Sequence, residues 1–218
     1  MNLIPVRTHI ITISLITALL GGCKVDTNVD LYSVDIKEID GTENFDTPSK
    51  IKIQVTGCDD NKSEIMNIAQ KYFEINSAAT CSNSDGEEFV EFSAKTPLVY
   101  NQEFLPKNIT FGIFISETED GSRAVWGMLD LSRFSAMEND VKKLDITASL
   151  ELNSITINLN NDGRETITVN VPAAFINNIA EINTELSLTR RENATLRLSD
   201  VGVSQVANNG KSLIFLMK

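Results

Sequence analysis

The stretch LDITASLELNSITINL, residues 144–159, decides the fold of this chain. Apolar and polar side chains alternate along it, which is the pattern of a β-strand with one buried face. The first half keeps one phase, at Leu144, Ile146, Ala148, Leu150 and Leu152. The second half takes the other phase, at Ile155, Ile157 and Leu159. Because the phase slips at Asn153-Ser154, we expect a bulge or bend there that keeps both halves facing one core.

The residues after this strand predict a turn. Asn161-Asp162-Gly163 is typical of a three-residue hairpin loop with Gly163 in the left-handed conformation. Such a hairpin would place Ile157 opposite Ile167, and Ile155 opposite Val169.

The same loop also resembles the first half of a calcium-binding EF-hand, with Asn158, Asn160, Asp162 and Gly163 at the right spacing. The twelfth position of that motif needs a bidentate glutamate, and it is occupied by Val169. The flanking residues also alternate as strands rather than helices. We therefore interpret the loop as a hairpin turn and predict no metal site.

Further strands are indicated by alternation at residues 51–55 and 88–94, and by a pair at 110–116 and 124–131 joined through Asp120-Gly121. Helices are predicted over residues 61–73, with Asn61 as N-cap, and over 132–144, with Ser135 and Glu138 as a capping pair. Residues 175–182 allow either a helix or a hairpin turning at Asn177-Asn178, and we prefer the hairpin. Short strands end the chain, with a last turn at 208–210.

These elements predict an α+β fold, a mainly antiparallel β-sheet with one or two short helices, after a cleaved signal peptide. We found no linker that divides the chain and no internal repeat. The predicted organisation is therefore a signal peptide over residues 1–22 and a single domain over residues 23–218.

The N-terminus has the pattern of a secretory signal. Residues 10–20 form an apolar run of eleven residues, whereas a membrane-spanning helix needs about 20. The run ends in Leu20, Gly21, Gly22 and Cys23, which resembles the lipobox of bacterial lipoproteins. The alternative is an ordinary signal peptide followed by a chance cysteine.

The lipobox resemblance implies that Leu20, Gly21 and Gly22 are read by the signal peptidase and that Cys23 carries a diacylglyceryl lipid. Two or three acyl chains would give firm membrane anchoring. Lys24 stands where aspartate favours inner-membrane retention in enterobacterial lipoproteins, so it favours an outer-membrane location, periplasmic or surface-facing. A Gram-positive lipoprotein remains an alternative.

The two other cysteines predict a disulfide. In an exported protein an even pair of cysteines such as Cys58 and Cys81 is typically bridged. By closing the loop between them, the bridge would add roughly 3 kcal/mol to the free energy of unfolding. The alternatives are a reactive thiol or half of a metal site. Neither is supported by a CxxC motif or by a histidine, since the chain's single histidine is His9 in the signal peptide.

Composition excludes several function classes. Cleavage before Cys23 leaves 196 residues with a formal charge of −12, which argues against nucleic-acid binding. Without a mature histidine, a Ser-His-Asp triad, a Cys-His dyad and histidine-rich zinc sites are excluded. Nucleotide fingerprints are absent from the sequence. We therefore predict that the protein is not an enzyme and needs no cofactor beyond the covalent lipid.

Several motifs together resemble a family of uncharacterised lipoproteins, a domain of unknown function, from Gram-negative bacteria and their prophages. The resemblance rests on the lipobox, on KVDT and DLY (residues 24–27 and 30–32), on Asp35, on Thr47-Pro48, on the Cys58/Cys81 pair, on residues 159–162 and on LTRRENATLRLSDVG at 188–202. The family brings no activity and no catalytic residues.

The function expected from the sequence is that of a lipid-anchored envelope module that binds another envelope protein. Exposed sheet edges would be its docking surface, by strand addition. The alternative is a carrier or sensor of an apolar ligand, held in a groove between sheet and helix. The sequence does not identify a small-molecule ligand.

Overall fold

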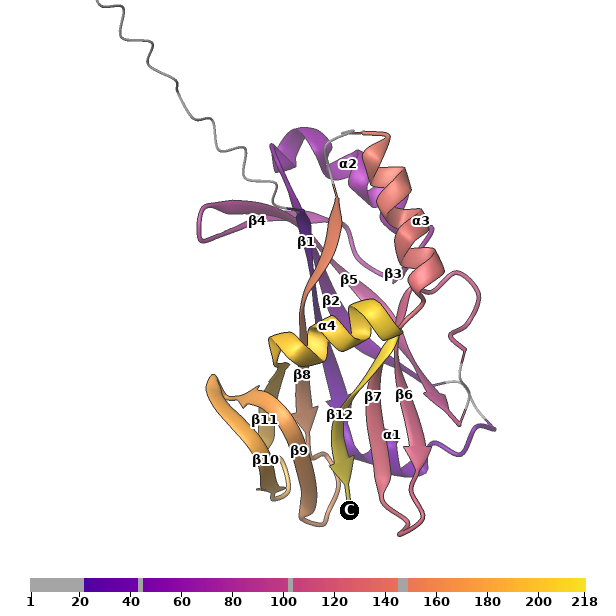
Figure 1. The fold of residues 1–218 in the computed structure, drawn as a ribbon, viewed down its shortest axis with the longest axis vertical. Coiled ribbons are helices and arrows are strands. Elements are labelled where there is room, and N and C mark those ends of the chain that lie inside the picture. Colours follow the sequence, from indigo (N-terminus) through magenta and orange to yellow (C-terminus); the bar gives the residue numbers. More distant parts are fainter. Residues whose placement is uncertain (1–21, 43–44, 102–103, 145–148) are drawn as a thin grey trace, which may run out of the picture.

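The computed structural model describes residues 22–42, 45–101, 104–144 and 149–218 (Figure 1). Leu20 and Gly21 of the lipobox, and Ile146 and Ala148 of the predicted strand, lie outside the described residues. The first half of the chain contains β1 (Cys23–Tyr32), α1 (Ser33–Glu38), β2 (Phe45–Val55), α2 (Cys58–Ala69), β3 (Glu74–Ile75), β4 (Thr80–Ser84), β5 (Glu87–Tyr100) and β6 (Phe111–Glu117). The second half contains β7 (Arg123–Leu129), α3 (Leu131–Lys142), β8 (Leu150–Asn160), β9 (Ile167–Ile176), β10 (Ile179–Leu188), β11 (Asn193–Leu198), α4 (Asp200–Asn209) and β12 (Lys211–Met217).

The strands form one twisted sheet in the order β10-β9-β11-β8-β1-β2-β5-β6-β7-β12, with β3 and β4 paired to β5. β12 also pairs with β9, so the sheet curls back on itself around the core. Most pairs are antiparallel, as predicted, but β1–β8 and β5–β6 are parallel, so the sheet is mixed. The described residues include four helices, where one or two were expected.

The bulge in the long strand is confirmed. β8 pairs with β1 in a register that shifts where Leu152 faces Val25 and Ser154 faces Asp26. The shift leaves Asn153 as the extra residue, so the side chains on both sides of it point into the same core. The buried side chains of β8 are Leu150, Leu152, Ile155, Ile157 and Leu159.

The predicted pairing after this strand is wrong. β8 and β9 are not neighbours, because β11 lies between them and Ile157 faces Leu196 instead of Ile167. The predicted partners Ile155 and Val169 are therefore also separated, and Gly163 is not left-handed. The reason is that residues 161–166 form a connection rather than a tight turn, and Asn161 at its start is buried.

The hairpin at residues 175–182 is confirmed. β9 and β10 pair antiparallel from Ile176 and Ile179 outward, joined by Asn177 and Asn178. Both asparagines have positive φ, 49° and 70°, as a type I′ turn requires.

The helix boundaries differ from those predicted because other residues cap them. α2 begins at Cys58 after a left-handed Gly57, so Asn61 is not the N-cap. α3 begins at Leu131, and the Asp130 carboxylate accepts a hydrogen bond from the Arg133 N–H, so Ser135 and Glu138 form no capping box.

Two helices were not predicted. α1 is a short turn between β1 and β2. α4 crosses the sheet close to β8 and β12 (Figure 1). The Ser199 hydroxyl accepts from the Gly202 N–H at its start, and a left-handed Gly210 ends it, where the sequence had indicated only a turn.

Candidate functional site

The cysteines predicted to be bridged form a disulfide. Cys58 at the start of α2 is bonded to Cys81 in β4. Among the described strands, β4 pairs only with β5. The disulfide therefore connects the hairpin of β4 and β5 to α2. This prediction is confirmed, and the bridge is a structural feature rather than a reactive one.

The predicted lipidation residue is the first residue of β1. Cys23 is half-buried and packs against the hydrophobic core, and its backbone N–H donates to the Ser149 carbonyl at 2.5 Å. The next side chain, Lys24, points the other way and forms an ion pair with Glu87 at 2.6 Å. Within the described residues, the first strand therefore begins at Cys23 itself.

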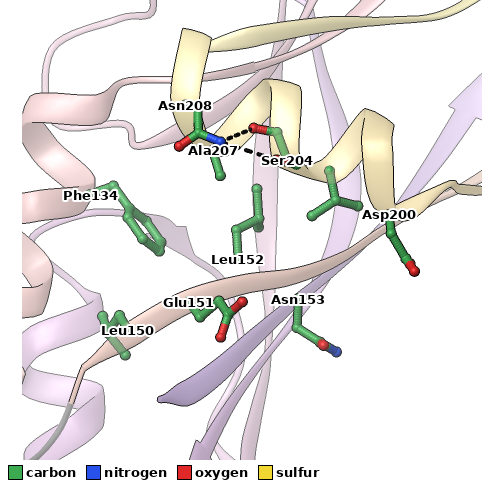
Figure 2. Close-up of a pocket in the computed structure, with 10 residues that line it drawn as sticks. Phe134, Leu150, Glu151, Leu152, Asn153, Asp200, Ser204, Ala207 and Asn208 are labelled. Carbon is green, nitrogen blue, oxygen red and sulfur yellow. Dashed lines mark hydrogen bonds between the residues drawn. The ribbon is translucent and has the colours of Figure 1, made fainter. Parts of the chain in front are cut away.

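A pocket of about 550 Å³ lies between α4 and the start of β8 (Figure 2). Phe134 of α3 closes one end, and Leu150 and Leu152 of β8 face Val203 and Ala207 of α4 across it. The rim is polar and consists of Glu151, Asn153, Asp200, Ser204 and Asn208. Apolar walls with a few polar groups are typical of small-molecule sites.

The sequence did not predict this pocket, because it did not predict α4. Ser199 as a cap, Val203 and Val206 at helical spacing, and Gly210 as an end were signals for that helix. The pocket has no histidine, cysteine, lysine or arginine among the lining residues that the structure describes. The titratable groups in this lining are the carboxylates of Glu151 and Asp200.

Asp140 of α3, whose pKa lies well below its usual value, is part of an ion-pair cluster away from this pocket. Asp140 of α3 accepts hydrogen bonds from Lys143 at 2.5 Å, Lys71 at 3.0 Å and the Tyr72 hydroxyl at 3.1 Å. The lysine ammonium groups, Lys143 before Lys71, lower the pKa of Asp140 to about 2. An acid this strong is ionised at neutral pH, so the cluster stabilises the contact of α3 with the end of α2 and is not a general acid.

Asp140→Asn tests this structural role through pH. The folded pKa of about 2 lies below the unfolded value of 3.8, so Asp140 stabilises the fold above about pH 4 and loses this effect as the pH falls toward 2. We expect Asp140→Asn to lower the free energy of unfolding by about 1 kcal/mol at pH 6, because the pairs are partly solvated, and by nearly nothing at pH 2. Urea unfolding between pH 2 and 6 measures both. A difference that did not change with pH would contradict the ion-pair account.

No cluster of three or more histidine, cysteine, aspartate or glutamate side chains suited to a metal ion occurs within the described ranges. In the same residues, no helix has the length and hydropathy needed to cross a bilayer.

Comparison with known proteins gives one match. A family model described as a domain of unknown function (DUF7424) matches residues 25–218. No curated protein and no solved structure matches the chain.

Proposed function

The chain belongs to this family of domains of unknown function, and we propose that it is a lipid-anchored envelope module that binds another envelope protein and catalyses no reaction. The observation that carries the binding role is the outer edge of β10. The anchoring role rests on the lipobox sequence. The proposed setting is the outer membrane of a Gram-negative host, with a prophage as one source of the gene.

Three features support the anchor. Leu20-Gly21-Gly22-Cys23 has the lipobox pattern, β1 begins at the same cysteine, and the family match begins two residues later. The proposed organisation is a signal peptide over residues 1–22 and one envelope domain over 23–218. The ion pair of Lys24 with Glu87 also gives this lysine a role in folding, separate from its proposed role in sorting.

β10 offers an edge for strand addition. In the part of the chain that the structure describes, only β9 pairs with it. In natural proteins, charges, bulges or covering elements usually prevent an edge strand from pairing with another chain. Here Ile179 and Ile182 are 64% and 76% exposed, among the most exposed large apolar side chains described. An extended peptide laid along this edge would gain backbone hydrogen bonds. Ile179 and Ile182 lie on opposite faces of the strand, so the side chains of the peptide would pack beside one isoleucine on each face.

Asn183 limits where a partner strand can lie. Its φ of 50° is left-handed. In the pairing of β10 with β9, Ile182 and Thr184 each face a residue of β9, whereas Asn183 between them does not. The edge is thus divided, and both exposed isoleucines lie on the part before Asn183. We therefore place the docking surface at residues 179–182. The carboxylate of Glu181 in this stretch favours a partner segment with lysine or arginine beside its apolar residues.

Site-specific crosslinking tests this surface. A photoreactive amino acid at Ile182 is expected to capture a discrete protein partner in living cells, identified by mass spectrometry. The same amino acid at Val201, which is 70% exposed on α4, is the matched control and is expected not to capture that partner. Ile179→Lys combined with Ile182→Lys is expected to reduce recovery of the partner at least tenfold. Equal capture from both positions, or full recovery with the double variant, would contradict the proposal.

The pocket beneath α4 favours a second candidate function, that of a carrier of an apolar ligand. The volume of this pocket, about 550 Å³, lies within the range of known ligand sites, about 300–1,000 Å³. Its walls include apolar side chains. One apolar molecule per chain in an organic extract of the purified protein, with no protein captured at Ile182, would favour this carrier over the binding module.

A further inference from the structure

A second, more apolar pocket lies beside the proposed anchor. Its volume is about 350 Å³. Its apolar walls come from Val55 of β2, Ile65 of α2, Val141 of α3 and Leu144 just after α3, and its polar lining residues are Gln54, Thr56 and Asn61. Cys23 lines the same pocket. Leu144 is 43% exposed and is the most accessible large apolar side chain of this wall.

The direction of the Cys23 side chain connects the anchor with this pocket. Val25, Val29 and Leu31, which share its phase on β1, are buried in the core. Cys23 belongs to this inward-facing set and packs against the same core cluster, whereas Lys24 faces Glu87 on the other side. Cys23 is half-buried and lines the pocket, so a group bonded to its sulfur starts at the pocket wall.

The position of Cys23 does not depend on the residues before it. Cys23 pairs with Leu150 in the parallel ladder of β1 and β8, and its N–H donates to the Ser149 carbonyl. Acylation of the new α-amine would turn it into an amide, which still carries one N–H, so this hydrogen bond survives processing. The sulfur thus keeps its place at the pocket in the mature, acylated chain.

We infer that one acyl chain of the lipid on Cys23 lies in this pocket rather than in the bilayer. The inference rests on the proposed lipidation of Cys23. Attachment to the pocket wall makes the local concentration of the chain high, so its binding needs no separate encounter. In a lipoprotein with three chains, two remain for the membrane, and two are enough for stable anchoring. The lipid would also hold the end of the domain formed by α2 and α3 close to the bilayer.

Photoreactive fatty acid is the probe. Cells that express the full chain are grown with a diazirine fatty acid, and the intact mass of the purified protein first reports whether Cys23 carries the lipid. After illumination, peptide mass spectrometry is expected to find the acyl chain crosslinked within the same molecule to peptides containing Ile65, Val141 or Leu144. Absence of the lipid mass would reject the anchoring proposal itself. Lipid present on Cys23 without these crosslinks would reject only the pocket.

Two variants and a control make the test specific. Leu144→Arg places a charge at an exposed position of the wall and is expected to lower the crosslink yield at least fivefold without unfolding the protein. Val141→Trp adds bulk to the pocket wall and is expected to lower the yield as well. Because Val141 is only 5% exposed, urea unfolding of this variant is measured alongside the yield. Val201→Arg, on an exposed face of α4, is the matched control and should leave the yield unchanged. Unchanged yields in both pocket variants, or crosslinks in the pocket that carry the mass of a free phospholipid, would overturn the assignment to the protein's own anchor.

Discussion

The chain exported with Cys23→Ala, behind a signal peptide that ordinary signal peptidase removes, is expected in the soluble periplasmic fraction. The natural chain is expected almost wholly in the membrane fraction. The reason is that two or three acyl chains hold a protein firmly, and the variant has no cysteine at residue 23 to carry them. The replaced signal peptide is necessary because the natural one would stay uncut without Cys23. Fractionation and immunoblotting measure the shift.

The control for this experiment is the removal of the other two cysteines. Cys58→Ala with Cys81→Ala deletes the disulfide and leaves the lipobox intact, so this variant should remain with the membrane. A soluble fraction that did not grow on loss of Cys23 would refute lipid anchoring. Lys24→Asp adds a finer measurement, since it should move the protein from the outer to the inner membrane if the enterobacterial sorting rule applies.

Asn161→Ala is expected to lower the free energy of unfolding by about 3–5 kcal/mol, the largest effect on stability that we predict. The buried Asn161 amide donates to the carbonyls of Leu188 and Glu165, both at 2.8 Å. Its oxygen accepts from the Ser33 hydroxyl at 3.0 Å and the Gly163 N–H at 3.2 Å. The alanine variant would remove all four hydrogen bonds, two of them buried, and the Ser33 hydroxyl would keep only the Asp162 carboxylate, at 3.2 Å. Loss of a partner for a buried polar group is costly.

Asn153→Ala is the matched control. Asn153 lies on β8 itself, but it is exposed and its amide reaches only the Asp26 carboxylate, at 2.7 Å. We expect a loss within about 0.5 kcal/mol, which is usual for a surface position. Urea unfolding of both variants gives the comparison. Similar losses at the two positions would mean that the network around Asn161 does not stabilise the fold as described.

The sequence predicted what local patterns determine. The phase slip at Asn153 identified the bulge, the two asparagines at 177 and 178 identified the β9–β10 hairpin, and cysteine parity identified the disulfide. The bulge and the hairpin follow from residues that are neighbours in the chain. The disulfide follows from the rule that paired cysteines of an exported protein are typically bridged. The capping residues of α2 and α3 were harder, because several polar residues near each start compete and tertiary contacts decide among them.

The insertion of β11 between β8 and β9 had no local signal. It depends on which distant strand covers Ile157 best, and alternation alone does not specify a partner. Asn161 shows the same limit, since a turn residue and a buried hydrogen-bonding residue look alike in sequence. Both pockets escaped prediction for related reasons. One needs α4, and the other needs the side chain of Cys23 to face the interior.

The start of β1 at Cys23 also has a consequence for the proposed lipidation and cleavage. In the folded chain this strand lies between β2 and β8, and a side-chain carbon added at Gly22 would come within 2.7 Å of the Ser149 hydroxyl. Gly22 and Cys23 are both half-buried once β1 is in place, which restricts access of a protease to the bond between them. Parallel pairing of strands so distant in sequence is slow to form. In the proposed pathway, this delay leaves time for lipid attachment and cleavage, and the domain then closes around a cysteine that already carries its acyl chains.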